Sequence, residues 1–214
     1  MYNEKTHASI IGLFYRSFRE EGEKGIRLFV KAAQFYAEQR GRRMSLRALR
    51  DGHKLDFDTY LAYGEWSAVC PITVEYGQEG NDFIERVYSC PWAETFAEMD
   101  LKDCGLAYCR EIDKGLVRGF NPELVFELKS VLHDSACCVQ VLKNYRPLKK
   151  ISSPPDAKKD WQFHCAHIFS AMSGIAHSAG MIGIVQKTEK LLAEKFGQEV
   201  LRRIINTEIN FNLI

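Results

Sequence analysis

The sequence predicts an α+β fold in which a small antiparallel sheet of about four strands packs with N-terminal and C-terminal helices. Apolar residues recur every three to four positions in the first and last thirds of the chain, as on the buried face of a helix. Between them, apolar and polar residues alternate near residues 67–89 and 124–143, as in half-buried strands. Two hairpins joined by helical sequence favour an antiparallel sheet.

The N-terminal part, residues 1–64, is expected to be helical. A second apolar stripe over residues 26–36 predicts a helix that ends near Gly41, and Ser45 can cap a short third helix. One or two further helical turns are expected in residues 56–63. The first stripe contains His7, Ile11, Phe14, Tyr15 and Phe18.

The first hairpin opens the α+β core, residues 65–145. Alternation from Ala68 onward predicts its first strand, in which Pro71 indicates an edge position or a bulge. A loop at residues 77–81 then leads to a second strand over residues 83–89.

A helical crossover connects the first hairpin to the second. Pro91 suits the first turn of a helix, and residues 101–113 continue as helix. Strands are then expected at residues 124–129 and 136–143, with His133-Asp134 at the turn between them.

The C-terminal helices occupy residues 156–214, after a surface linker at residues 149–159. The first of them is expected to begin at about Asp156 or later and to break near Gly180 or Gly183. A second follows over residues 188–196, and the apolar tail has no clear pattern. The linker does not mark a boundary, so all 214 residues are interpreted as a single domain.

Composition restricts the partners. The chain has 29 basic and 28 acidic residues, a net charge of +1, so a nucleic-acid partner is not expected. A cluster of arginines is interpreted as a solvated helix end; it contains Arg40, Arg42, Arg43, Arg47 and Arg50. The start of the chain lacks the features of a signal peptide, and no apolar run of about 18 residues exists. We therefore expect a cytoplasmic protein with a small-molecule substrate or ligand and no membrane partner, and leave a homo-oligomer open.

The seven cysteines are expected to be free thiols. An odd number without a secretion signal argues against a disulfide framework, and no Cys-x-x-Cys pair supports a zinc ribbon. Free cysteine is commonly a small buried hydrophobic residue. No cofactor is therefore expected, although a metal is left open by the histidine pair described next.

His164 and His167 lie on the predicted C-terminal helix. They are separated by roughly 60° on a helical wheel, above a strip of small residues that includes Gly174. Three interpretations stay open: structural histidines, the polar wall of a ligand pocket, or two ligands of a metal ion.

Cys109 and Asp113 are four residues apart on a predicted helix and share one face. A carboxylate does not activate a neighbouring thiol, whereas a cation does. Cys109 is therefore either a core thiol or a nucleophile that needs a protonated His164 or His167, oriented by Asp113. The catalytic interpretation requires Cys109 or Cys137 to lie near one of these histidines.

Three further positions have both ordinary and functional interpretations. Asp134 is typical of a turn. Cys137 and Cys138 point to opposite faces of their strand, so only one of them can face a cleft. The amide of Asn121 can bind a carboxylate or cap a turn.

Through the motifs at these positions, the chain resembles the L-2-amino-thiazoline-4-carboxylic acid hydrolase family. The resemblance covers roughly residues 10–200. It departs from the family pattern at His133, where the hairpin typically reads Gly-Asp, and at Cys138 beside Cys137. The similar motifs are Cys90-Pro91-Trp92, Tyr108-Cys109, Asp113, Asn121-Pro122, Asp134, Cys137 and the run from Phe163 to His167.

The resemblance implies a hydrolase acting on carbon–nitrogen bonds in cyclic amidines. Water attacks the ring carbon between nitrogen and sulfur, and the product is an N-carbamoyl amino acid. The implied catalytic residues are Cys109 as nucleophile, Asp113 as orienting group, and His164 and His167 for proton transfer. The implied substrate-binding residues are Trp92, Tyr108, Asn121, Asp134 and Cys137. The alternatives are a ligand-binding or sensor domain of vinyl-4-reductase type, which the middle section distantly resembles, and a metal-binding protein.

Overall fold

The computed structural model describes residues 2–147 and 151–213, in which eight helices and four strands form an α+β fold. The helices are α1 (Glu4–Arg19), α2 (Gly22–Arg50), α3 (Phe57–Ala62), α4 (Pro91–Glu98), α5 (Lys102–Phe120), α6 (Trp161–Ser178), α7 (Ile182–Phe196) and α8 (Gln198–Ile205). The strands are β1 (Thr73–Glu79), β2 (Asp82–Ser89), β3 (Phe126–Ser130) and β4 (Cys138–Leu142). The predicted fold class is confirmed.

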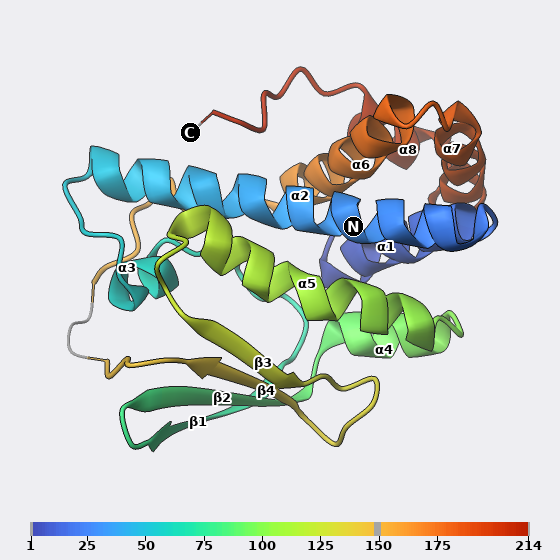
Figure 1. Cartoon of the computed structure of the whole chain (residues 1–214). Coiled ribbons are helices and arrows are strands. Elements are labelled where there is room, and N and C mark those ends of the chain that lie inside the picture. Colours follow the sequence, from blue (N-terminus) through green and yellow to red (C-terminus); the bar gives the residue numbers. More distant parts are fainter. Residues whose placement is uncertain (1, 148–150, 214) are drawn as a thin grey trace.

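The elements are arranged in layers. The sheet lies at one side of the molecule and α5 covers it, while α2 crosses over α5 (Figure 1). Helices α6, α7 and α8 gather on the other side, where α6 packs against both α1 and α2. Helix α5 therefore lies between the sheet and the main helical layer.

The sheet has the order β1-β2-β4-β3, with every neighbouring pair antiparallel, as the two predicted hairpins require. The first strand begins at Thr73 rather than near Ala68, so Pro71 precedes the ladder and removes no hydrogen bond from it. Phe83 of β2 and Leu142 of β4 pack towards Val117 of α5. Alternate residues of these two strands, such as Glu85 and Gln140, therefore share that helix-facing side.

The predicted break of the second helix near Gly41 is wrong, and so is the separate helix capped by Ser45. Helix α2 runs unbroken through both positions. A Cβ atom at Gly41 would overlap the Leu116 carbonyl oxygen and lie 2.6 Å from the Phe120 nitrogen. Gly41 therefore lets α2 and α5 approach closely, instead of ending a helix.

Replacement of Gly41 by alanine is expected to lower the free energy of unfolding by about 2 kcal/mol, because overpacking outweighs the gain in helix propensity. Gly174 is the matched control: it is an exposed position on α6 with open space around its Cα. Gly174→Ala should raise stability by up to about 1 kcal/mol. Urea denaturation of both variants measures the difference, and equal shifts would contradict the proposed close contact.

The C-terminal third follows the prediction in outline. Asp160 caps α6 by accepting a hydrogen bond from the amide of Phe163 at 2.7 Å, and α6 ends at Ser178, just before Gly180. Helix α7 begins at Ile182, earlier than predicted. Two residues of the predicted linker, 149 and 150, lie outside the described residues.

The tail without a clear pattern contains α8, followed by a segment that returns to α2. Phe211 in this segment is buried, and its carbonyl oxygen accepts a hydrogen bond from Arg43 at 2.6 Å. In the described part of the chain, no helix is long and apolar enough to cross a membrane.

Candidate functional site

A cavity of about 180 Å³ lies between the helical layer and the sheet. Helices α4 and α5 form one wall, strands β2 and β4 form another, and the turn between β3 and β4 closes one side. Its lining residues are Trp66, Ile72, Val87, Cys90, Trp92, Ala93, Tyr108, Cys109, Ile112, Asp113, Val131, Leu132, His133, Cys138 and Gln140. Of the predicted site residues, the cavity brings together Trp92, Tyr108, Cys109 and Asp113.

Asp113 presents a carboxyl group from α5 to this cavity. The Gln140 side chain donates a hydrogen bond from Nε2 to Asp113 Oδ2 at 3.2 Å. Burial raises the pKa of Asp113 to about 6, although the positive charge of Arg40 opposes this shift. Asp113 therefore changes its protonation state near neutral pH, as an acid–base group requires.

Glu85 is a second carboxyl group beside the first. It lies opposite Gln140 in the β2–β4 ladder, on the strand face that also carries the cavity-lining Val87. Burial and the nearby Asp113 raise the pKa of Glu85 to about 7. The two carboxyl groups each make ionisation of the other less favourable.

Cys109 contacts His133, not the histidines of α6. Its Sγ atom lies 3.4 Å from His133 Nε2. Gly105 makes this possible, because a Cβ atom there would overlap the His133 imidazole. Burial lowers the pKa of His133, and burial together with Cys90 and Asp113 raises the pKa of Cys109 well above its usual value. Thiol and imidazole are therefore both neutral at pH 7.

Tyr108 contributes a hydroxyl group that has no hydrogen-bond partner within the described part of the chain. The residue is 1% exposed and lines the cavity. Since buried polar groups are nearly always satisfied, this hydroxyl is available to a molecule inside the cavity.

The indoles of Trp66 and Trp92 form an aromatic wall. Their rings stack with centroids 4.7 Å apart at an interplanar angle of 16°. Trp66 donates a hydrogen bond from Nε1 to His164 Nδ1 at 3.3 Å, and Trp92 donates one to His7 Nδ1 at 3.1 Å. Histidines behind the wall therefore hold both indoles in place.

His164 and His167 are buried outside the cavity lining. His164 Nε2 donates a hydrogen bond to the Glu65 carbonyl oxygen at 3.2 Å. His167 contacts Gln39 through Nε2 at 3.0 Å and Arg43 through Nδ1 at 3.3 Å. His164 Nδ1 accepts the hydrogen bond from Trp66 described above. All four ring nitrogens of the two histidines therefore contact protein groups.

Neither histidine of α6 supplies a cation to Cys109. Burial and the Arg40 charge lower the pKa of His164 to about 3, and burial and Arg43 hold that of His167 well below its usual value. Both imidazoles are neutral. The predicted contact of Cys109 with His164 or His167 is therefore not made. Cys109 contacts the neutral His133 instead, which the sequence analysis placed at the turn.

The expected solvated helix end is wrong for three of its five arginines. Arg40, Arg43 and Arg47 lie on one face of α2, are at most 2% exposed, and all form ion pairs with the buried carboxylate of Glu65. The distance from Arg43 Nη2 to Glu65 Oε2 is 2.8 Å. Arg42 and Arg50 are exposed, as predicted.

The other predicted substrate-binding residues do not line the cavity. Asn121 takes the turn-capping role. Its Nδ2 atom donates a hydrogen bond to the Leu55 carbonyl oxygen at 2.8 Å, and its Oδ1 atom accepts one from the Glu123 amide at 3.0 Å. Asp134 pairs with Arg110 at 2.7 Å on the surface. Cys138, not Cys137, faces the cavity.

Sequence reasoning missed several lining residues as site residues, namely Trp66, Cys90, His133, Cys138 and Gln140. Two of them had a signal: His133 and Cys138 are the positions at which the chain departs from the family pattern, and both line the cavity. The alternation that predicted β4 also placed Gln140 on the same face as Cys138.

The described residues assemble no group of three or more His, Cys, Asp or Glu side chains with the geometry of a metal site. The engaged nitrogens of His164 and His167 agree with this finding. All seven cysteines are free thiols, as predicted.

Fold and cavity together define an α+β protein that encloses thiol, imidazole and carboxyl groups between its helices and its sheet. The chain belongs to the L-2-amino-thiazoline-4-carboxylic acid hydrolase family, whose model matches residues 3–139. The matched region extends from α1 into β4 and contains every lining residue except Gln140. No curated protein and no solved structure matches the chain significantly.

Proposed function

We propose that the protein is a hydrolase that opens a small cyclic amidine-like ring and produces an N-carbamoyl compound. The observation that carries this proposal is the arrangement within one cavity of about 180 Å³, which is lined by Asp113, by the Cys109–His133 pair and by Tyr108, whose hydroxyl has no partner among the described residues. A nucleophile, a base and an electrostatic anchor are the groups that such a ring opening needs.

Asp113 is the anchor in this proposal. Its ionised form pairs with the N–H groups of the amidinium, and charge-assisted hydrogen bonds of this kind are stronger than neutral ones. The indoles of Trp66 and Trp92 contribute apolar aromatic surface to the cavity that would hold the ring.

Cys109 is the proposed nucleophile, with His133 as its base. His133 Nε2 takes the thiol proton while Sγ bonds to the ring carbon between nitrogen and sulfur. The ring carbon–sulfur bond then breaks, and the leaving sulfur takes the proton from His133. Water, deprotonated by His133, attacks the same carbon; the bond to Cys109 breaks, its thiol regains a proton, and a urea-type carbonyl is released.

His133 thereby takes the role that the resemblance implied for His164 and His167. His164 keeps a supporting role, since its Nδ1 atom accepts a hydrogen bond from the indole N–H of Trp66 at the cavity wall. A neutral base is sufficient here, because the proton moves only as the new carbon–sulfur bond forms.

Replacement of Cys109 by serine is expected to lower turnover about 100-fold, because the hydroxyl is a much weaker nucleophile than the thiol. Release of the new thiol from 2-amino-2-thiazoline compounds measures turnover, and mass spectrometry should detect a covalent adduct on Cys109 of the wild-type protein. Cys70→Ser is the matched control, because Cys70 does not line the cavity. Unchanged thiol release in the Cys109 variant would remove the nucleophile from the scheme.

A second candidate is a non-catalytic small-molecule-binding domain that uses the same cavity. It is favoured by the pKa of Cys109, which burial holds well above its usual value, so that the resting thiol is not ionised. This candidate predicts stoichiometric ligand binding without any thiol release from cyclic amidines.

A further inference from the structure

The charged and polar groups that face the cavity are those of a cation-binding site. We propose that the cavity selects a small planar cation of the amidinium class that carries no carboxylate, held by Asp113 in a cavity lined partly by aromatic residues. This inference rests on the proposed function, because it names the substrate class of the same site. It makes the preferred product a carbamoyl derivative of an aminothiol rather than of an amino acid.

The charge distribution is the first argument. Asp113 is the charged side chain among the described lining residues, which contain no lysine or arginine. Arg40 is close by, with its guanidinium carbon 4.0 Å from the centroid of the Trp66 ring, but it does not line the cavity and pairs with Glu65, which it shares with Arg43 and Arg47. Glu85, beside Asp113, adds to the negative character of this end of the cavity.

The hydrogen-bond donors are the second argument. The indole N–H groups of Trp66 and Trp92 are used by His164 and His7. The amide of Gln140 donates to Asp113.

Helix α4 also begins at the cavity, with Cys90 as its N-cap residue. Burial raises the pKa of the Cys90 thiol, so this lining group is neutral at pH 7.5. Tyr108 is a buried lining side chain whose hydroxyl has no partner among the described residues.

A bound carboxylate would lose its hydration without gaining a lysine or arginine partner among the described lining residues, in a cavity that already contains a carboxyl group. Burial of an anion without a cationic partner is strongly unfavourable. A bound amidinium instead gains the Asp113 charge, and the aromatic side chains of Trp92 and Tyr108 line the same cavity.

Isothermal titration of the intact protein with two probes tests this inference at pH 7.5. The probes are 2-amino-2-thiazoline and its 4-carboxylate, which share the same ring. We expect the uncarboxylated cation to bind at least tenfold more tightly, a difference that corresponds to 1.4 kcal/mol. Tighter or equal binding of the carboxylate would overturn the inference.

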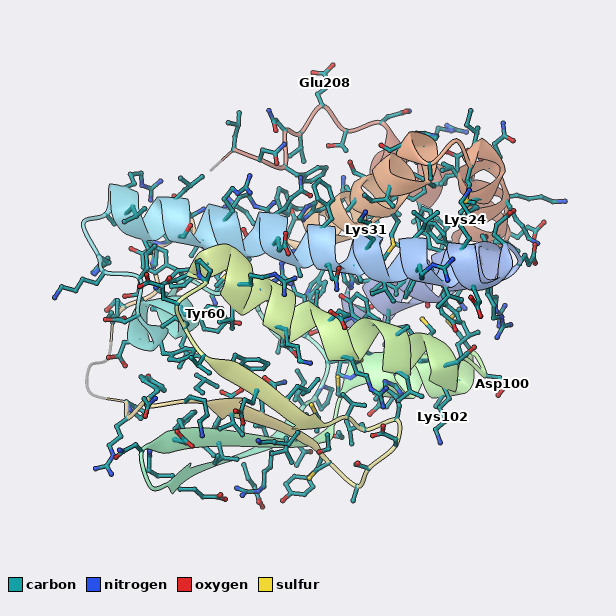
Figure 2. All side chains as sticks on the ribbon, viewed as in Figure 1. Lys24, Lys31, Tyr60, Asp100, Lys102 and Glu208 are labelled. Atoms are coloured by element: carbon teal, nitrogen blue, oxygen red, sulfur yellow. The ribbon has the colours of Figure 1, made fainter. Side chains whose placement is uncertain are left out.

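Asp113→Asn is expected to weaken binding of the cation at least tenfold, because it removes the charge but keeps the size of the side chain. Asp100→Asn is the matched control, since Asp100 is an exposed residue at the turn between α4 and α5 (Figure 2). Asparagine also tolerates the positive φ of 55° at this position. An unchanged affinity in the Asp113 variant would remove the proposed anchor.

The titration also separates the inference from the proposed function. Binding of the uncarboxylated cation that depends on Asp113, without thiol release, supports the inference and overturns the proposed hydrolysis. Turnover of the carboxylate in preference to the uncarboxylated ring supports the proposed hydrolysis and overturns the inference.

Discussion

Replacement of Glu65 by glutamine is expected to lower the free energy of unfolding by about 4 kcal/mol, because it leaves three buried arginines without their counter-ion. Arg40, Arg43 and Arg47 contact the Glu65 carboxylate at 3.3, 2.8 and 2.9 Å, and the Glu65 side chain is fully buried. Burial opposes ionisation of Glu65, but the three arginines outweigh it and lower its pKa to about 2.

Chemical denaturation of the wild type and the Glu65→Gln variant measures this effect. Glu23→Gln is the control, because Glu23 forms an exposed ion pair with Arg27 and should change stability by less than about 0.5 kcal/mol. The lowered pKa of Glu65 also sets the pH range over which the ion pairs stabilise the fold. The stabilisation is complete above the unfolded-state value of 4.5 and is lost as the pH falls towards 2. A small effect at pH 7 would show that the cluster is not a stabilising centre.

Periodicity predicted most of the fold because it reports local burial. The boundaries that failed depend on contacts between distant parts of the chain. Gly41 is indistinguishable in the sequence from a helix-ending glycine, and only its contact with Leu116 shows why it lies within α2. Similarly, the arginines of α2 are hydrophilic by type, and nothing local indicates that Glu65 meets them in the core.

The candidate site could be predicted in part. Helical spacing placed Cys109 and Asp113 on one face, and both line the cavity. Spacing does not reveal which imidazole a thiol meets. His133 was assigned to a turn, yet the turn folds back over α5 because Gly105 leaves room for its ring. The histidines of α6 attracted attention as a pair, but His164 supports the cavity wall through Trp66, whereas His167 contacts Arg43 and Gln39.

Replacement of Asp113 by asparagine is expected to have opposite effects on activity and stability. Removal of the anchoring charge is expected to lower turnover at low substrate concentration at least about tenfold, in line with the expected loss of affinity. The same change should stabilise the fold at pH 8 by roughly 1–3 kcal/mol, because the raised pKa means that ionisation of Asp113 costs folding free energy. Asparagine retains an oxygen that can accept the hydrogen bond from Gln140.

The pH dependence of that gain follows from the direction of the shift. The folded-state pKa of about 6 lies above the unfolded value of 3.8, so the penalty is absent below pH 3.8 and complete above pH 6. The stability difference between variant and wild type should therefore grow across this interval. The groups that face Asp113 and set its charge are Arg40 from α2, Tyr60 from α3 (Figure 2), Glu85 and Gln140 from the sheet, and Tyr108 and Cys109 from its own helix.

A residue that destabilises the fold in its ionised form is difficult to explain by folding alone. If Asp113 were structural, its replacement would lower stability and leave any turnover in proportion to the folded fraction. If it anchors a cationic ring, activity falls while stability at pH 8 rises. Parallel measurement of thiol release and urea midpoints, with Asp100→Asn as the variant that should change neither, distinguishes the two roles. A loss of both activity and stability at pH 8 would assign Asp113 to the core rather than to the site.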